Sequence, residues 1–243
     1  MISVMPEQNF PTKTEHAYWV LRRAIVTGGF DDGAPLDEVE LMSRFDVGRT
    51  PIREAIKRLA GEEFIIWHPH RTPHVRSTSA DDLASLFEAR HFFEIPAVRL
   101  AAQRATPAEL ELMEQVCGQL DAAIVDSKLY EAVELDYDFH LALAKASHNR
   151  FLVNAISHLN FGSLRLWYRS YVRMGTEGIN DHHLQQLDAI RSHNADLAVS
   201  IAHEHINDSH QRQLRQFGLA PDLGEPNSSA APAPKLQHAR GVI

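Results

Sequence analysis

Two side chains four residues apart in one stretch of the chain have the types and the spacing of metal ligands. Asp136 and His140 lie in the segment 130–147, whose apolar pattern predicts a helix. Side chains at positions i and i+4 project from the same face of a helix, so a carboxylate oxygen and an imidazole nitrogen can reach one ion. Such pairs are also common on helix surfaces, so this pair alone does not establish a site.

Two further histidines lie in apolar settings on later predicted helices. His183 faces the inward side of its helix, and His205 is followed by an isoleucine. With Asp136 and His140 they form a candidate set of one carboxylate and three imidazoles, which leaves a coordination position open and is typical of Zn²⁺, Ni²⁺ or Mn²⁺ sites. The chain has 15 histidines and one cysteine, so a thiolate cluster is excluded and most histidines must serve elsewhere.

The segment 41–59 has the layout of a helix-turn-helix. It reads LMSRFDVGRTPIREAIKRL, with apolar positions that form a small core and Pro51 in the first turn of its second helix. Arg49, Thr50 and Arg53 fall at the start of that helix, the end that contacts base edges in the major groove. An arginine there can bind guanine through two hydrogen bonds, and a threonine can reach a phosphate. The alternative is a three-helix core with solvated arginines.

The charge distribution agrees with a nucleic-acid contact at this segment, although the whole chain carries a formal net charge of -8. Between residues 10 and 78 ten Lys and Arg residues balance ten Asp and Glu residues, whereas 79–218 holds twelve against nineteen. Residues 41–58 carry five basic and two acidic side chains, a local charge of +3. A basic patch of this kind can contact phosphates while the rest of the protein stays acidic.

The predicted fold class is mainly α, in two parts. Segment 10–78 predicts a winged helix-turn-helix domain, with helices at about 14–27, 37–45 and 50–62 and two short strands at 64–67 and 72–76. Segment 79–218 predicts an antiparallel bundle of about six helices. They are expected at about 81–104, 107–126, 130–147, 149–173, 181–198 and 200–217. Residues 219–243, rich in Pro, Ser, Ala and Gly, are expected to form a disordered tail.

The motif GRTPIREAIKRL at 48–59, followed by a β-wing, resembles the GntR superfamily of bacterial transcriptional regulators. The second part is similar to the FCD effector domain of the FadR branch of that superfamily. Its matching pieces are Arg90 with Glu94, the segment DYDFHLALAKASHN, the segment HHLQQLDAI and the segment AHEHINDS. The resemblance covers almost all of residues 12–217.

For the first part, the resemblance implies that Arg49, Thr50 and Arg53 contact DNA. We add Arg44 and Gly48, from the same segment, as candidate DNA-binding residues. The chain departs from the usual pattern at Gly48, where the family has Ser or Thr, and in the wing HPHRTP at 68–73, which lacks a glycine. In the preceding helix, valine at position 39 stands where an arginine is common. The operator or the affinity is therefore expected to differ from the common pattern.

For the second part, the resemblance implies one divalent ion on the four candidate ligands. Counting back from DAI at 188–190 selects His183 rather than its neighbour His182. His203 lies two residues before the candidate ligand His205, so it faces about 200° away on a helix. Arg90 is expected either to face the same cavity and bind a carboxylate effector, or to serve as a structural partner of Glu94.

These features predict a regulator that binds a double-stranded DNA operator as a homodimer, with half-sites about one helical turn apart. A small effector, an organic acid, would ligate the open metal position and shift the population of conformations. Two alternatives remain open at this point: a metal-dependent enzyme, and a regulator with a purely structural metal site. We expect no enzyme, because no further carboxylate is placed as a general base and an enzyme would not need a helix-turn-helix.

The hydropathy of the chain predicts a cytoplasmic protein. No apolar run approaches the roughly 20 residues of a membrane-spanning helix. The first residues also lack the apolar core of a signal peptide. We therefore expect no membrane partner.

Overall fold

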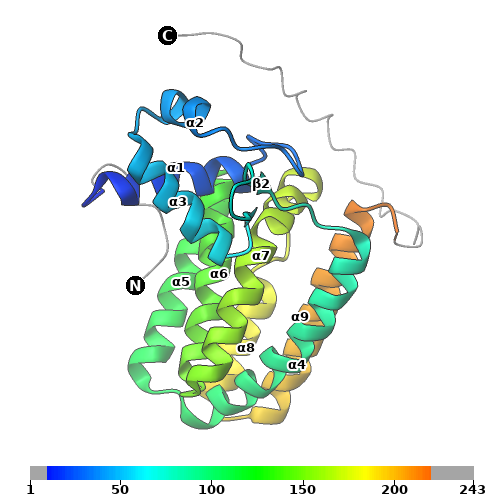
Figure 1. Cartoon of the computed structure of the whole chain (residues 1–243). Coiled ribbons are helices and arrows are strands. Elements are labelled where there is room, and N and C mark those ends of the chain that lie inside the picture. Colours follow the sequence, from blue (N-terminus) through cyan, green and yellow to red (C-terminus); the bar gives the residue numbers. More distant parts are fainter. Residues whose placement is uncertain (1–9, 220–243) are drawn as a thin grey trace.

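The first part of the structure is built from three short helices and a hairpin (Figure 1). In this computed structural model, which describes residues 10–219, they are α1 (Lys13–Val26), α2 (Glu38–Phe45), α3 (Arg49–Gly61), β1 (Ile65–Ile66) and β2 (His74–Val75). The strands pair antiparallel, with Ile65 opposite Val75. The side chains of Thr12 and Asp37 accept backbone N–H groups at the starts of α1 and α2, which is why those helices begin there.

The second part contains six helices in the described residues. They are α4 (Ala80–Arg104), α5 (Pro107–Val125), α6 (Leu129–Ala146), α7 (Arg150–Met174), α8 (Asp181–Arg191) and α9 (Ala195–Gln216). Helix α6 packs against α4, α5 and α7, while α4 and α9 run side by side along one flank (Figure 1). Outside the hairpin, no strand occurs in residues 10–219. The predicted tail, apart from Leu219, lies outside the described residues.

The boundary between the last two helices was predicted wrongly. The sequence pattern predicts helices at 181–198 and 200–217, whereas α8 ends at Arg191 and α9 begins at Ala195. His193 adopts a left-handed backbone with φ of 54°, and its N–H donates to the carbonyl of Ile190. Asn194 then caps α9 by accepting the N–H of residue 197. A left-handed residue ends a helix, whatever the hydrophobic pattern around it.

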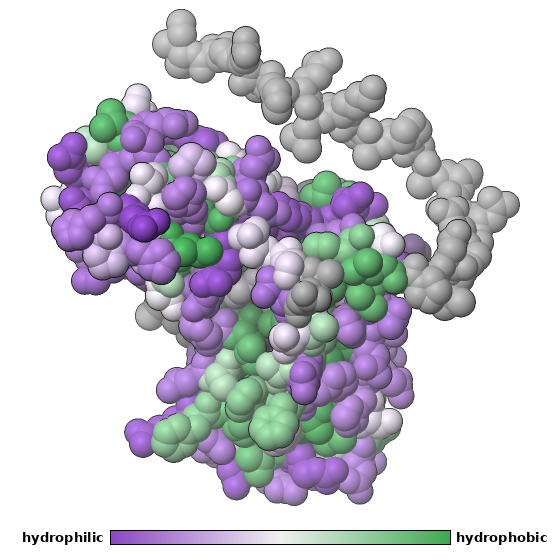
Figure 2. Space-filling model, turned by 45° about the vertical axis from the view of Figure 1, so that its right-hand side comes forward, coloured by the Kyte–Doolittle hydropathy of each residue, from purple (hydrophilic) through white to green (hydrophobic). Residues whose placement is uncertain are grey.

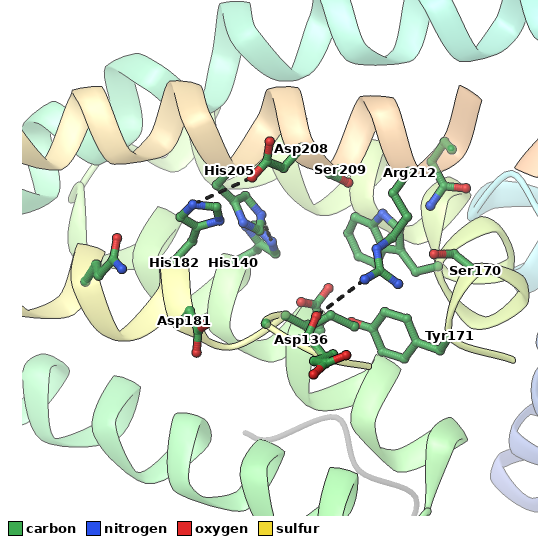
Figure 3. Close-up of a pocket in the computed structure, with 16 residues that line it drawn as sticks. Asp136, His140, Ser170, Tyr171, Asp181, His182, His205, Asp208, Ser209 and Arg212 are labelled. Atoms are coloured by element: carbon green, nitrogen blue, oxygen red, sulfur yellow. Dashed lines mark hydrogen bonds and ion pairs between the residues drawn. The ribbon is translucent and has the colours of Figure 1, made fainter. Parts of the chain in front are cut away.

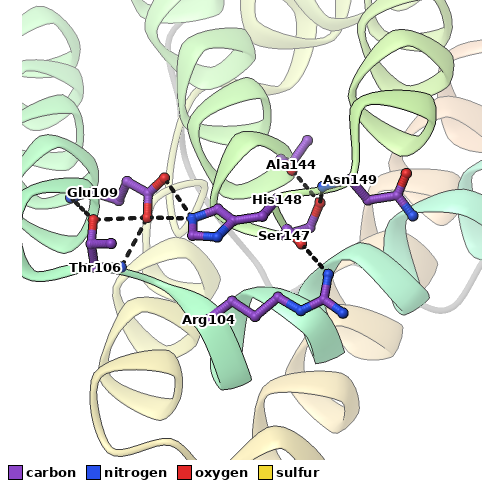
Figure 4. Close-up of polar contacts among 7 residues, drawn as sticks. All are labelled: Arg104, Thr106, Glu109, Ala144, Ser147, His148 and Asn149. Carbon is purple, nitrogen blue, oxygen red and sulfur yellow. Dashed lines mark hydrogen bonds and ion pairs between the residues drawn. The ribbon is translucent and has the colours of Figure 1, made fainter.

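The same three residues, Ser-His-Asn, make the turn between α6 and α7 (Figure 4). His148 is left-handed there, with φ of 53°, and Asn149 caps α7. Nε2 of His148 lies 3.0 Å from Oε1 of Glu109 in the first turn of α5, and Arg104 donates to the carbonyl of Ser147 at 2.9 Å. The repeated tripeptide is therefore a turn signal in this chain. The sequence pattern predicts the boundary at the first copy, between 147 and 149, and misses the one at the second copy.

A buried ion pair joins the two parts. Nη1 of Arg22 in α1 lies 2.6 Å from Oε1 of Glu134 in α6, and the two side chains are 1% and 0% exposed. The rings of Trp19, Phe64 and Phe161 surround the guanidinium at 4.9, 5.9 and 5.5 Å from their centroids. Because a charge in such surroundings is costly without a partner, each of these two residues requires the other.

A second polar contact between the parts lies nearer the solvent. Arg165 and Arg169 of α7 reach the two carboxylate oxygens of Asp32 at 2.9 and 2.8 Å. Arg165 also donates to the carbonyl of Phe30. The connection between α1 and α2 is thus held on α7. None of the helices in residues 10–219 is long and apolar enough to cross a membrane.

The buried pair can be tested through stability. We expect Arg22→Ala and Glu134→Ala each to lower the free energy of unfolding by about 3–5 kcal/mol, because each leaves one buried charge unpaired. The double variant Arg22→Met/Glu134→Leu should cost less than either single change, because it removes both charges and keeps the volume. Urea unfolding followed by circular dichroism measures all three. Single variants as stable as the parent would contradict the pairing.

Candidate metal centre and nucleic-acid interface

Three imidazoles from three helices converge inside the bundle. His140 of α6, His183 of α8 and His205 of α9 each offer a ring nitrogen, and these atoms all lie within 4.8 Å of one another. Nε2 of His140 and Nε2 of His205 are 3.3 Å apart. Two nitrogens that bind one ion at about 2.1 Å, at angles of about 90–110°, are separated by about 3.0–3.4 Å. The spacing therefore fits two ligands of one ion.

His183 gives a second test of this fit. Its side chain is 0% exposed, yet neither ring nitrogen has a hydrogen-bond partner in the described structure. Leaving a buried polar group unsatisfied costs free energy, which a nitrogen–metal bond would offset. Oδ1 of Asp136 lies 3.5 Å from Nε2 of His183 without forming a hydrogen bond. Of the four predicted ligands, the three imidazoles therefore form the cluster, and Asp136 lies next to it through His183 without belonging to the group within 4.8 Å. Imidazole and carboxylate donors of this kind suit a divalent ion.

Burial also sets the protonation of these groups. Desolvation lowers the pKa of His183 to about 3 and lowers the pKa values of His140 and His205 well below the usual range. All three imidazoles are then neutral near pH 7, which is the form that coordinates a metal. Desolvation raises the pKa of Asp136 to about 7. A cation beside this carboxyl would favour its ionised form.

Arg90 is linked to the imidazole cluster through Glu94. Its buried guanidinium binds both carboxylate oxygens of Glu94, at 2.7 and 3.3 Å, and donates to Oγ of Ser209 at 3.2 Å. Oε2 of Glu94 in turn lies 3.6 Å from Nδ1 of His140, the position of an outer carboxylate that orients a metal-binding imidazole. Of the two predicted roles for Arg90, the structural partner of Glu94 is the one seen, and Arg90 does not line the cavity described next.

A cavity of about 380 Å³ lies beside the cluster (Figure 3). His140, His182 and His205 lie at one end, and Tyr171 and Arg212 lie at the other. Asp136 lies between the two ends. The volume is within the range of about 300–1,000 Å³ that small-molecule sites occupy. A small ligand can thus reach the imidazole cluster.

The far end of the cavity was missed by the sequence analysis. Arg212 stands seven residues after His205 on α9, so two helical turns place both on one face. Trp167, Ser170 and Tyr171 share one face of α7 at i, i+3 and i+4. The spacing from His205 could have indicated Arg212, whereas nothing in the sequence places α7 beside it.

His182 and His203, which lie close in sequence to the candidate ligands His183 and His205, occupy different positions relative to the cluster. His203 is exposed and stacks on His91, with ring centroids 5.4 Å apart. His182 lines the cavity but lies outside the three-imidazole cluster, and its Nε2 is 3.8 Å from Oδ2 of Asp208. In the described structure His203 therefore points away from the candidate metal centre, and His182 lies at its rim.

The start of α3 presents the candidate DNA contacts to solvent. The side chains of Arg49 and Arg53 are 64% and 53% exposed, and their Nε atoms lie 3.9 and 3.6 Å from the carboxylate of Glu38. Thr50 beside them is exposed. Both arginines line a groove whose other wall is the wing, including Arg71. Exposed ion pairs with these N–O distances are weak, so DNA phosphates or bases can replace Glu38 as the partner of the two arginines.

Gly48 and Arg44 contribute differently. Gly48 is the N-cap of α3 and gives no side-chain hydrogen bond, while an added Cβ would lie 3.8 Å from Cδ of Pro51. The backbone thus has room for the Ser or Thr that the resemblance led us to expect. The guanidinium of Arg44 stacks on Phe30, 4.6 Å from the ring centroid, and donates to the carbonyl of Gly29 at 3.4 Å. Arg44 does not line the groove that holds Arg49 and Arg53.

Comparisons with known proteins agree with this architecture. The structure is similar to that of E. coli McbR/YncC, with a TM-score of 0.72 and 19% identity over 86% of this chain and 100% of the other. The "Nta operon transcriptional regulator" of Aminobacter aminovorans is 34% identical over 131 residues, 54% of this chain and 62% of that protein. The "HTH-type transcriptional repressor RspR" of Escherichia coli K12 is 29% identical over 205 residues, 83% of this chain and 90% of that protein.

The family matches cover both parts of the chain. Residues 13–75 match the bacterial regulatory proteins of the gntR family, and residues 85–208 match the FCD domain. The predicted fold class is confirmed by the family match and the similar structure. The metalloenzyme alternative is wrong, because the relatives found by sequence are named transcriptional regulators. The chain belongs to the gntR family of bacterial regulatory proteins, with an FCD domain as its second half, and is a DNA-binding transcriptional regulator.

Proposed function

We propose that this regulator binds a divalent metal ion and that a small organic acid at the metal modulates its binding to DNA. The ion would be held by Asp136, His140, His183 and His205, and Zn²⁺, Ni²⁺ or Mn²⁺ suits these donors. The observation that carries the proposal is the convergence of three neutral, buried imidazoles, of which His183 has no other partner. When bound, the ion supplies a Lewis-acidic position for an oxygen ligand.

The cavity favours a regulatory site over a purely structural one. A structural metal site is closed by protein ligands, whereas His140 and His205 here line a cavity of about 380 Å³. Arg212 at the other end of the same cavity supplies a positive charge that attracts a carboxylate. These two features support an acid as the effector.

Two helices can carry the response to the DNA-binding part. Helix α6 bears two of the proposed ligands and also Glu134, the partner of Arg22. Helix α7 lines the cavity and also holds Asp32 through Arg165 and Arg169. An effector that favours one arrangement of α6 and α7 would therefore shift the position of the DNA-binding part.

An exposed apolar face supports a homodimer. Phe92 on α4 is 75% exposed and Phe151 on α7 is 71% exposed. Their neighbours in the sequence, Phe93 and Leu152, pack against buried Ile156. Figure 2 shows apolar side chains gathered on the surface of the helical part. A second copy on this face would bury them and present two recognition helices to one operator.

The proposed DNA contacts predict a loss of affinity. Arg49→Ala and Arg53→Ala should each weaken specific binding by about 1–3 kcal/mol, because each removes a base contact. Fluorescence anisotropy with DNA from the gene's own upstream region measures the change. Arg99→Ala, which removes an exposed arginine paired with Asp196 far along α4, should bind as the parent does. Unchanged affinity and footprint in both groove variants would refute the assignment.

The proposed ligands predict a loss of metal. The purified protein should carry about one divalent ion per chain, and His140→Ala or His183→Ala should remove it. His182→Ala and His203→Ala are the matched controls and should keep it. Elemental analysis by mass spectrometry gives the content of each. Full metal in the His140 and His183 variants, or loss in the controls, would mean that other residues bind the ion.

The proposed dimer predicts that charged substitutions on this apolar face lower the molecular mass of the protein in solution. Phe92→Glu and Phe151→Glu should convert a dimer to a monomer, because each places a charge in the apolar interface. Light scattering reports the mass, and operator affinity should fall with it. Val125→Glu changes an equally exposed apolar residue, 82% exposed on α5, and should leave the dimer intact. A monomeric parent, both free and on DNA, would refute this part of the proposal.

A further inference from the structure

The first turn of α2 exposes an apolar side chain between two acidic residues. Val39 follows Glu38 and precedes Glu40, and it is 62% exposed. Ile66, the next most exposed large apolar side chain in the described part of 10–78, is 38% exposed. The buried face of α2 is formed by Leu41, which is 1% exposed, so Val39 is not needed for the core. A single exposed valine is common on protein surfaces, so its position must show whether it has a role.

Val39 lines the groove that holds the candidate DNA contacts. Arg49 and Arg53 of α3 line the same groove, and Arg71 of the wing lies on its other wall. Glu38, the residue before Val39, lies 3.9 and 3.6 Å from the Nε atoms of Arg49 and Arg53. The first turn of α2 and the start of α3 therefore face the same side. A duplex whose base edges are contacted by the start of α3 would also lie against Val39.

The groups on this turn restrict what Val39 can contact on DNA. Asp37, Glu38 and Glu40 bring negative charge to the same turn, which disfavours a phosphate there. The side chain of Val39 has no hydrogen-bond donor or acceptor, so it cannot read the polar atoms of a base edge. The bases present one apolar group in the major groove, the C5-methyl group of thymine. Contact between that group and the methyl groups of valine removes both from water.

We propose that Val39 contacts the C5-methyl group of one thymine in each operator half-site and so determines specificity at that base pair. This inference rests on the proposed DNA contacts of Arg49 and Arg53, because they bring the start of α3 into the major groove. Cytosine in place of this thymine lacks the methyl group, and its N4 amino group would meet a side chain that cannot accept a hydrogen bond. The protein therefore selects thymine at this position by an apolar contact.

Removing a single methyl group from the DNA tests the contact. The probe is a duplex selected from a random library by the full-length protein, and deoxyuridine replaces its thymines one at a time. Deoxyuridine pairs with adenine as thymine does and lacks only the C5-methyl group. We expect the replacement of one thymine in each half-site to weaken binding about three- to fivefold, the effect of one buried methyl group. Fluorescence anisotropy measures each Kd.

Val39→Ala separates this contact from thymine contacts made by other side chains. The variant should bind the thymine and deoxyuridine duplexes equally at that one position and keep the parent's preference at all others. Val125→Ala makes the same change at a valine that is 82% exposed on α5, and it should keep the whole profile of the parent. If Val39→Ala keeps the parent's preference at every thymine, the proposal is overturned. A loss of affinity that is equal on all duplexes overturns it too, because it indicates a sugar or phosphate contact.

Val39→Ala should fold as the parent does, because the side chain is exposed and alanine favours a helix more than valine does. Thermal unfolding followed by circular dichroism should therefore give the parent's Tm. Arg49→Ala and Arg53→Ala on the same duplexes test the proposed DNA contacts separately. An unchanged Kd in both would refute those contacts. Weaker binding by both, with the thymine preferences of Val39→Ala unchanged, would overturn only the role of Val39.

Discussion

The structure depends on one constraint: most of α6 is buried in the middle of the molecule, so each of its buried charged groups needs a partner. Glu134, Asp136 and His140 occupy fewer than two turns of this helix and are all buried. Glu134 pairs with Arg22 from the DNA-binding part through its Oε1. Asp136 and His140 face the imidazole cluster and its cavity. The requirement to pair buried charges thus fixes both the contact between the two parts and the composition of the candidate metal centre.

Local sequence signals predicted most of the fold, because they act over a few residues. The motif at 48–59 located α3, and Thr106 with Pro107 located the start of α5. The boundary between α8 and α9 was missed because the apolar residues before and after the polar segment 192–194 keep the spacing of one continuous helix. The backbone nevertheless turns at His193. Hydrophobic periodicity reports which face is buried and carries no information on a single left-handed residue.

The candidate site was predictable only in part, for a similar reason. The spacing of Asp136 and His140 is a local property of one helix, whereas the meeting of Tyr171 with Arg212 at the far end of the cavity depends on how α7 packs against α9. The role of Arg90 was open in the sequence because Glu94, four residues on, competes with a ligand for the same guanidinium. In the structure the carboxylate of Glu94 lies 2.7 Å from Nε of Arg90, and binding of an effector by Arg90 stays a prediction.

Pairing across the interface also limits how a signal can pass. A buried ion pair at 2.6 Å has few alternative geometries, so a shift of α6 must move α1 with it or break the pair. The contacts of Arg165 and Arg169 with Asp32 are closer to solvent and can exchange partners at less cost. If the buried pair stays intact while the ion pairs of Asp32 break and re-form, the DNA-binding part would rotate about α1. Under the proposed function, the effector can shift this position only by as much as its affinity differs between the two arrangements.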